Sequence, residues 1–128
     1  MKFGVICLFI STLVACGKAK LPDGSYDLDF DSELWKNKAS LDFDDSFITM
    51  RQRMLGDLID NHLLGKSSMV LIKELGNASD KMDPDGKGPA LSYPTGPQRD
   101  SYMAIDSEWL IIEFNEKGLA YKYSIRSD

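Results

Sequence analysis

The strongest constraint on the fold is a β-hairpin pattern near the C-terminus, in residues 108–126 (EWLIIEFNEKGLAYKYSIR). An apolar run is followed by a turn with a glycine at its end, residues 115–118, and then by a second strand-like run. Alternation with a period of two is typical of a strand with one buried and one solvated face. The pattern therefore predicts two antiparallel strands of a small sheet.

The second strand of this hairpin alternates strictly along its length. Its more apolar face consists of Leu119, Tyr121, Tyr123 and Ile125. We expect this face to pack into the core, and we assign the Tyr121 ring to the core as well. Ala120 and the polar residues that alternate with this set are expected on the opposite, solvated face.

The first strand carries apolar side chains on both faces. Leu110, Ile112 and Phe114 share one face, which we expect to meet the helices. Trp109 and Ile111 lie on the opposite face, so that the first strand is predicted to be partly apolar on both sides.

Two helices are predicted before the hairpin. Residues 46–64 place apolar side chains at steps of three and four, and Gly65 stands where a left-handed residue commonly closes a helix. Residues 67–75 form a shorter helix that begins with a serine cap and ends at Gly76. Gly56 costs the first helix about 1 kcal/mol relative to alanine, which indicates either close packing at that point or simple tolerance.

The other segments have the composition of tether and loop. Residues 18–25 (KAKLPDGS) are polar and precede any periodicity. Residues 26–45 interleave acidic with apolar and aromatic side chains, and we expect irregular chain whose aromatic rings pack onto the domain. Residues 78–99 contain four prolines and three glycines, so we expect loop there apart from a short strand at 90–93.

The N-terminus has the features of an export signal. Lys2 is followed by an uncharged run over residues 3–14. As a helix rising about 1.5 Å per residue, this run reaches only about 18 Å, well short of a bilayer core of about 30 Å. The run is therefore too short to span a membrane comfortably, and we expect it to be removed.

Residues 13–16 (LVAC) resemble the lipobox of bacterial lipoproteins. The resemblance implies cleavage between Ala15 and Cys16, attachment of diacylglycerol to the Cys16 thiol and acylation of the new amino terminus. Two or three acyl chains hold a protein on a membrane, whereas one chain binds only reversibly. Gly17 resembles the sorting pattern for the outer membrane, so we expect the periplasmic side of that membrane. A disulfide between Cys16 and Cys7 is not expected, because Cys7 lies in the segment to be discarded and cleavage leaves Cys16 without a partner, and no ligand cluster accompanies Cys16 for a metal site.

The predicted organisation is a signal peptide at 1–15, a lipidated cysteine with tether and irregular segment at 16–45, and an α+β domain at 46–128. Removing the signal, which holds one lysine and no acid, leaves 14 basic and 20 acidic residues, a formal charge of −6 over 113 residues. An acidic surface disfavours nucleic acid as a partner. The expected membrane contact is through the acyl chains.

No catalytic or metal-binding set is indicated. The single histidine, His62, lies beside Asn61 near the end of the first helix, where a surface or capping role is expected. Asp27, Asp29 and Asp31 alternate, but they lack the glycine and the glutamate that an EF-hand loop requires. We therefore expect no enzyme activity, no cofactor and no bound metal.

Aromatic side chains are the candidates for partner binding, because aromatics are enriched at the energetic centres of interfaces, although they also build small cores. The candidates are Trp35, Tyr102, Trp109 and Ile111. The role of Trp109 and Ile111 depends on residues 26–45. If that segment folds over them they are internal; otherwise they form an exposed apolar patch that marks a partner site.

The order of the predicted elements resembles that of the SmpA/OmlA (BamE-like) family of small outer-membrane lipoproteins, whose fold is related to that of the β-lactamase inhibitor proteins. The likeness covers residues 47–125 and is carried by GKS at 65–67, LG at 75–76, Phe114 and Gly118. It implies an α+β domain with two helices packed on a three-stranded antiparallel meander.

Together these features predict a lipid-anchored envelope protein with a non-catalytic interaction or scaffold role in outer-membrane maintenance or assembly. The alternative is an inhibitor or immunity lipoprotein that neutralises a toxin or lytic enzyme, which an acidic domain with an inhibitor-like fold allows. A carrier of a small ligand is a third hypothesis, and it requires an apolar pocket between the sheet and the helices.

Overall fold

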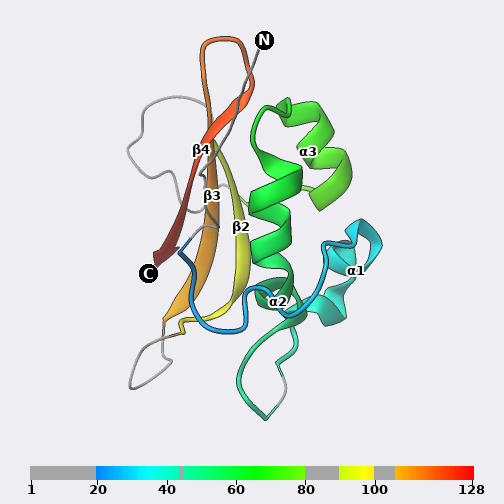
Figure 1. Ribbon diagram of the computed structural model, residues 1–128, viewed down its shortest axis with the longest axis vertical. Helices are drawn as coiled ribbons and strands as arrows, with labels where there is room; N and C mark the ends of the chain where they lie inside the picture. Colours follow the sequence, from blue (N-terminus) through cyan, green and yellow to red (C-terminus); the bar gives the residue numbers. More distant parts are fainter. Residues whose placement is uncertain (1–19, 44, 80–89, 100–105) are drawn as a thin grey trace, which may run out of the picture.

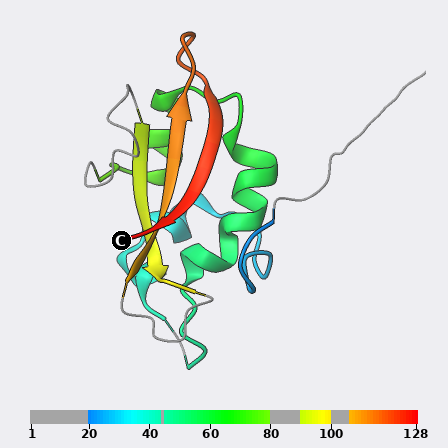
Figure 2. The ribbon, with the colours of Figure 1, turned by 90° about the vertical axis from the view of Figure 1, so that its left-hand side faces the viewer.

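The structure is a computed structural model in which three antiparallel strands form one sheet. The residues that it describes are 20–43, 45–79, 90–99 and 106–128. Strands β2 (Ala90–Pro97), β3 (Ser107–Phe114) and β4 (Ala120–Ser127) follow one another in space as they do in sequence, with β3 in the centre. Helices cover one face of the sheet, which lies in front of them in Figure 2. The predicted α+β class and the antiparallel meander are confirmed.

The helices predicted over 46–64 and 67–75 are both present (Figure 1). The described helical segments are α1 (Ser32–Lys36), η1 (Lys38–Leu41), α2 (Met50–Asp57), η2 (Leu58–Leu63) and α3 (Ser68–Leu75). The segment η2 continues α2 as a π-helix, so the two form one rod. Gly65 and Gly76 have the predicted positive φ angles, +84° and +85°.

The first long helix begins later than predicted. Its N-cap is Thr49, whose side chain accepts from the backbone N–H of Gln52 at 3.0 Å. The Gln52 side chain accepts in turn from the N–H of Thr49 at 3.0 Å. This reciprocal capping box satisfies two free donors and fixes the start of the helix at Met50. The prediction that the helix starts at residue 46 is therefore wrong.

The segment 26–45 is more regular than the irregular chain that we predicted. Asp31 caps α1 by accepting from the N–H of Leu34, and Asn37 caps η1 by accepting from the N–H of Ala39. Such caps stabilise helices of a single turn. Trp35 of α1 is fully buried, and its ring centroid lies 6.3 Å from that of Tyr93.

The core lies between the helices and one face of the sheet. Leu110, Ile112 and Phe114 of β3 contribute to it, as predicted. The buried apolar side chains supplied by the helices are Trp35, Met54, Leu55, Leu58, Ile59, Leu63, Leu71 and Leu75. Leu21 and Phe30 pack against the same cluster, so the part of the chain before residue 46 shares this core.

A β-bulge changes the faces of β4. Glu113 pairs with Lys122 and the next residue, Phe114, pairs with Ala120, which leaves Tyr121 without an opposite partner. One extra residue moves the side chains before it to the other face. Ala120 is buried, and Tyr121 is 54% exposed. The predictions of a core position for Tyr121 and a solvated one for Ala120 are wrong for this reason, although the later apolar side chains of β4 do pack against the core.

Strand β2 extends beyond the predicted 90–93. It contains Pro94 and Pro97, which lack a backbone donor, but it is an edge strand, where proline is tolerated. A register shift lies between Pro94 and Gly96. A Cβ on Gly96 would lie 2.6 Å from Cγ2 of Thr49, so this irregular part of β2 comes close to the start of α2.

Candidate functional site

The structure places three of the four predicted binding residues in the interior. Trp35, Trp109 and Ile111 are buried, and Nε1 of Trp109 donates to Oδ1 of Asp128 at 3.3 Å. Tyr102 lies outside the described residues, as do Ala15 and Cys16 of the predicted cleavage and lipidation site. An exposed apolar patch at Trp109 and Ile111 is therefore contradicted.

The segment 26–45 is not what buries those two side chains. Of its apolar side chains, Phe30, Leu34 and Trp35 pack on the helical side of the sheet against the main core, where the ring centroids of Phe30 and Trp35 lie 6.2 Å apart. Trp109 and Ile111 do not belong to that core cluster, because they point to the opposite face of β3. Their burial makes them interior residues.

His62 belongs to a small polar group that ties residue 30 to the helix. Its Nε2 lies 3.2 Å from Oδ2 of Asp57, which also accepts from the N–H of Phe30 at 2.7 Å. Asn61 donates to the other carboxylate oxygen at 2.8 Å. The backbone donor of Phe30 first, and then Asn61 and the nearby His62, lower the pKa of Asp57. This arrangement holds two chain segments together.

Two of the three alternating acids are engaged, each with a different partner. Asp27 pairs with Arg53, and Asp31 caps α1. Within the described ranges, no group of three or more His, Cys, Asp and Glu side chains could hold a metal ion. None of the helices found in those ranges is long and apolar enough to cross a membrane.

Residues 21–30, which we call the strap, run along the helix α2. The N–H of Gly56 donates to the carbonyl of Ser25 at 2.6 Å, and the N–H of Leu28 donates to the carbonyl of Arg53 at 2.9 Å. A Cβ on Gly56 would lie 2.3 Å from the ring of Tyr26. Close packing is therefore the reason for a glycine inside this helix, because the aromatic ring occupies the space of a side chain.

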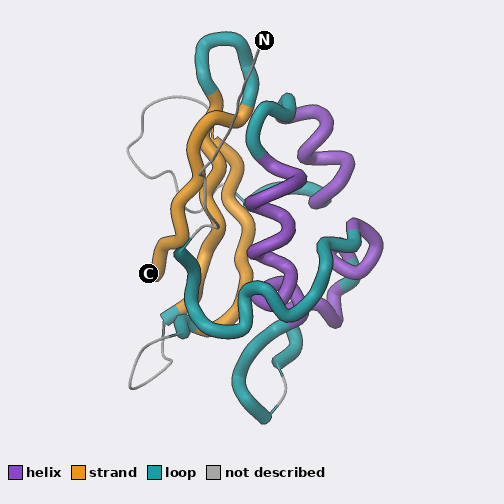
Figure 3. Tube along the Cα trace, in the orientation of Figure 1, coloured by secondary structure: helices purple, strands orange, loops and turns teal. Residues whose placement is uncertain are grey.

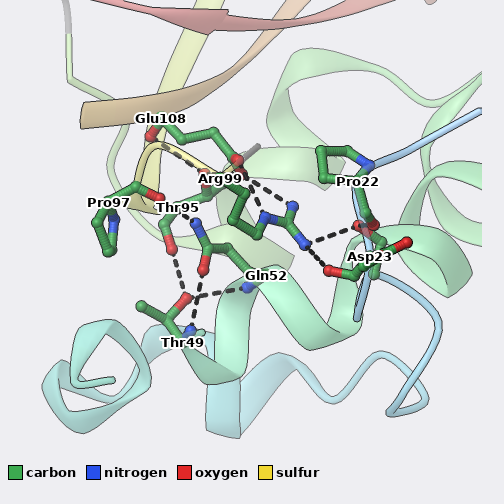
Figure 4. Close-up of polar contacts among 9 residues, drawn as sticks. Pro22, Asp23, Thr49, Gln52, Thr95, Pro97, Arg99 and Glu108 are labelled. Carbon is green, nitrogen blue, oxygen red and sulfur yellow. Dashed lines mark hydrogen bonds and ion pairs between the residues drawn. The ribbon is translucent and has the colours of Figure 1, made fainter. Parts of the chain in front are cut away.

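A buried ion pair fastens the start of the strap. Arg99 and Glu108 form a two-pronged contact, with Nε 3.1 Å from Oε1 and Nη2 3.0 Å from Oε2. The remaining donor, Nη1, contacts the carbonyl of Asp23 at 2.9 Å and Oγ of Ser25 at 3.0 Å. Figure 4 shows the guanidinium between Glu108 and Asp23. Bidentate, charge-assisted hydrogen bonds of this kind are among the strongest in proteins.

The same network continues to the capping box of α2. Oγ1 of Thr95 donates to Oε2 of Glu108 at 2.7 Å, and Oγ1 of Thr49 donates to the carbonyl of Thr95. Nε2 of Gln52 donates to the carbonyl of Pro97 at 2.8 Å (Figure 4). The strap, the start of α2 and the lower ends of β2 and β3 are thus joined by satisfied polar groups. These contacts fix the chain directly after the loop that precedes α2.

That loop, of which residues 42, 43 and 45–49 are described, presents two aromatic rings to solvent, and we call these described residues the aromatic loop. Phe43 is 52% exposed and Phe47 is 60% exposed, and their ring centroids lie 5.5 Å apart. A β-bridge between Phe43 and Thr49 closes the loop. Phe47 has a φ of +62°, an unfavourable conformation for a residue with a bulky side chain. The loop projects at the lower end of the molecule in Figure 3.

The start of α3 and the beginning of β4 lie at the opposite end of the long axis (Figure 1), and they carry a second group of exposed apolar side chains. Gly65 donates to the carbonyl of Ala120, and Ala120 donates to the carbonyl of Lys66, both at 2.8 Å. These bonds bring the start of α3 beside the bulge of β4. Met69 is 81% exposed there, and Tyr121 is also exposed. The two exposed surfaces are candidates for contact with other molecules, and sequence periodicity alone placed Phe47 and Tyr121 on buried faces.

The fold and these surfaces define a small α+β domain with a latched N-terminal strap and exposed apolar groups at its two ends. No family model matches the sequence, and comparison with curated proteins and with solved structures finds no match either. A function is therefore inferred from the sequence of the chain, its strap and its exposed apolar groups.

Proposed function

We propose that this chain is a lipid-anchored protein of the cell envelope, held at the periplasmic side of the outer membrane through acyl chains on Cys16. Its role is non-catalytic: it binds another envelope protein as an interaction or scaffold component in outer-membrane maintenance or assembly. We also propose that it belongs with the SmpA/OmlA (BamE-like) lipoproteins. The order of two helical segments, an edge strand and a hairpin supports this assignment.

The observation that carries the interaction role is the exposure of Phe43 and Phe47 on a loop whose ends are fixed. Two phenylalanine rings in water leave apolar area that burial would stabilise by about 25 cal/mol per Å². A left-handed φ at Phe47 adds a conformational cost, and strained residues concentrate at binding and switch regions. Because neither feature contributes to the core, both are consistent with selection for contact.

The strap supports the anchored arrangement. Leu21 packs against the core and Ser25 is bonded to both Gly56 and Arg99, so the domain is fastened from residue 21 onward. Between Cys16 and Leu21 the chain advances five residues, which span at most about 18 Å when fully extended. A lipid on Cys16 would therefore keep the domain close to the membrane surface, where its partners would be other membrane-proximal proteins.

Two experiments test this proposal separately. Metabolic labelling with a palmitate analogue is expected to label the wild-type chain and not Cys16→Ser, and a label that persists in the variant would refute the anchor. Photo-crosslinking in intact cells from position 47 and from position 69 is expected to capture envelope protein from at least one site. An absence of adducts from both positions, with crosslinker incorporation verified by mass, would refute the interaction role.

An inhibitor or immunity role remains the second candidate, and the aromatic loop favours it too, since a protruding loop fixed at both ends can insert into the cleft of an enzyme. Under this alternative, the adduct from position 47 would be a lytic enzyme or toxin, and loss of the protein would sensitise cells to it.

A further inference from the structure

We infer that the aromatic loop is the docking surface for a protein segment that presents lysine or arginine beside an apolar side chain. This inference rests on the proposed interaction role and specifies the chemistry of the partner.

The apolar part of the docking surface consists of two aromatic rings and the residue that follows the loop. Phe43 and Phe47 are each more than half exposed and contact one another, so they form one continuous surface. Met50, also exposed, follows at the first helical position. A partner side chain of matching character, such as leucine, would bury part of this surface on contact.

The charge of the same surface selects a cationic partner. Asp42 and Asp45 are both exposed within the loop. From residue 39 to residue 50 the chain has no basic residue. Complementary charge speeds encounter and excludes wrong partners, so a basic segment fits here and an anionic lipid surface does not.

The two arginines that follow the loop, Arg51 and Arg53, are already engaged. Arg51 donates through Nη1 to the carbonyl of Pro94 and through Nε to the carbonyl of Trp35. Arg53 is paired with Asp27 and donates to Oγ of Ser46. Among the described acids of the loop, Asp42 and Asp45 form no ion pair with these arginines, and the ring faces beside them also attract cations.

The loop is held in shape before any partner arrives. Thr49 at its end is buried and bonded to Gln52 and to Thr95, and the bridge from Thr49 to Phe43 closes the other side. A surface fixed in its bound shape loses little conformational entropy on binding. Affinity should therefore respond to the rings and charges themselves.

The test uses the full-length lipoprotein in nanodiscs of neutral phosphatidylcholine and three labelled decapeptides of alternating sequence: leucine with lysine, leucine with glutamate, and serine with lysine. Fluorescence anisotropy is expected to show binding of the leucine–lysine peptide, with at least tenfold weaker binding of the other two. Equal binding of the serine–lysine peptide would mean general attraction to an acidic protein and would overturn the inference.

Matched variants locate the site. The pair Phe43→Ser and Phe47→Asn is expected to weaken binding at least tenfold; asparagine at 47 tolerates the left-handed φ, so the fold is not strained by the change. Asp42→Asn with Asp45→Asn should weaken binding about threefold to tenfold and reduce its salt dependence. Met69→Ser with Tyr121→Ser, and Glu116→Gln, are the controls at the other end. Equal losses in the controls and in the loop variants would place the site elsewhere.

The alternative partner for the aromatic loop is a second copy of this chain. At its opposite end, Lys66 and the exposed Met69 combine a cation with an apolar side chain three positions away. Analytical ultracentrifugation of detergent-solubilised protein should find a monomer, and self-association lost in the loop variants would overturn the inference. In cells, adducts from position 47 should map to partner peptides containing lysine or arginine next to an apolar residue. Adducts from position 69 alone would refute the inference and leave the proposed function intact, whereas none from either would refute both.

Discussion

The side chains of Arg99 and Glu108 lie almost completely out of water, 6% and 3% exposed, and face one another through two parallel hydrogen bonds. Arg99 also holds the backbone of Asp23, 76 positions away in the sequence. One guanidinium therefore connects the strap to the central strand. A pair this well buried is stabilising only while both partners and their hydrogen bonds are present.

Arg99→Met is expected to lower the free energy of unfolding by about 3–5 kcal/mol, because it leaves the Glu108 carboxylate buried and unpaired. Urea unfolding followed by circular dichroism measures this. Replacing both residues, Arg99→Met with Glu108→Met, should recover a substantial part of the loss, and a double variant as unstable as the single one would contradict the explanation. Glu33→Gln, at an exposed pair with Lys36, should change little.

Gly56→Ala is expected to destabilise the protein, although alanine is the better helix former. The new methyl group would overlap the ring of Tyr26, and overpacking of this kind costs about 1–3 kcal/mol. In a Tyr26→Ala background the overlap is gone, so the same substitution should stabilise by about 1 kcal/mol. Thermal unfolding of the four proteins checks this reversal of sign, and additive effects would show that the ring and the glycine are not coupled.

Stability should decline in acid in a way that depends on Asp57. Its pKa is lowered below the ordinary 3.8, chiefly by the N–H of Phe30. A lowered folded-state pKa contributes stability that is present above pH 3.8 and is lost as the pH falls through the folded-state value. Asp57→Asn should therefore have a lower free energy of unfolding than the wild type at pH 7. The difference between the two proteins should become smaller as the pH falls toward 2. Equal gaps at both pH values in urea unfolding would rule this out.

At high pH, the stability of the fold should depend on the ionisation of Tyr93. Burial raises the pKa of this phenol from 10.0 to about 12, and its hydroxyl donates to the carbonyl of Gly76 at 2.8 Å. The raised pKa contributes stability that is complete below pH 10 and is lost as the pH rises toward 12. Burial raises the pKa of Tyr123 as well, so absorbance at a tyrosinate wavelength should show more than one delayed phenol, and Tyr93→Phe should remove the phase near pH 12. A phase near pH 12 that persists in the variant would assign it to another tyrosine.

Relieving the backbone at Phe47 should stabilise the fold while weakening contact. Phe47→Gly removes the side chain that disfavours φ = +62°, and we expect a gain of about 0.5–1 kcal/mol. Phe43 does not have a positive φ, so Phe43→Gly serves as the control and should not stabilise the fold. A loss of stability for Phe47→Gly in thermal unfolding would mean that the ring supports the loop and that its exposure is incidental.

The parts of the fold that followed from the sequence are those set by local periodicity. The faces of β3 and the glycines that end both helices depend on residues a few positions apart in the sequence. Local patterns of this kind can be recognised from the sequence alone. The bulge at Tyr121 could not be predicted, because the alternation of apolar and polar residues in the sequence continues through it without a break. Phe47 fitted the three- and four-residue steps of the helix, yet the capping box of Thr49 and Gln52 begins the helix after it. That Thr-x-x-Gln spacing was the available signal.

The polar network of the candidate site could not have been predicted in the same way. Arg99, Glu108, Thr95 and Ser25 become neighbours only when the sheet has formed, and charged residues on a sequence are ordinarily solvated. Burial of Trp109 and Ile111 was likewise a property of tertiary structure. Sequence patterns indicate which element a residue joins more readily than what finally covers it.

The latch between Asp23 and Arg99 also sets an order of events when the chain is made. Because Asp23 is bonded to a side chain 76 positions later, this contact of the strap cannot form until Arg99 has been synthesised. Closing so long a loop is entropically slow compared with forming a hairpin or a helix turn. In newly made molecules, the strap should therefore be fastened to Arg99 only after the helices and the sheet have formed.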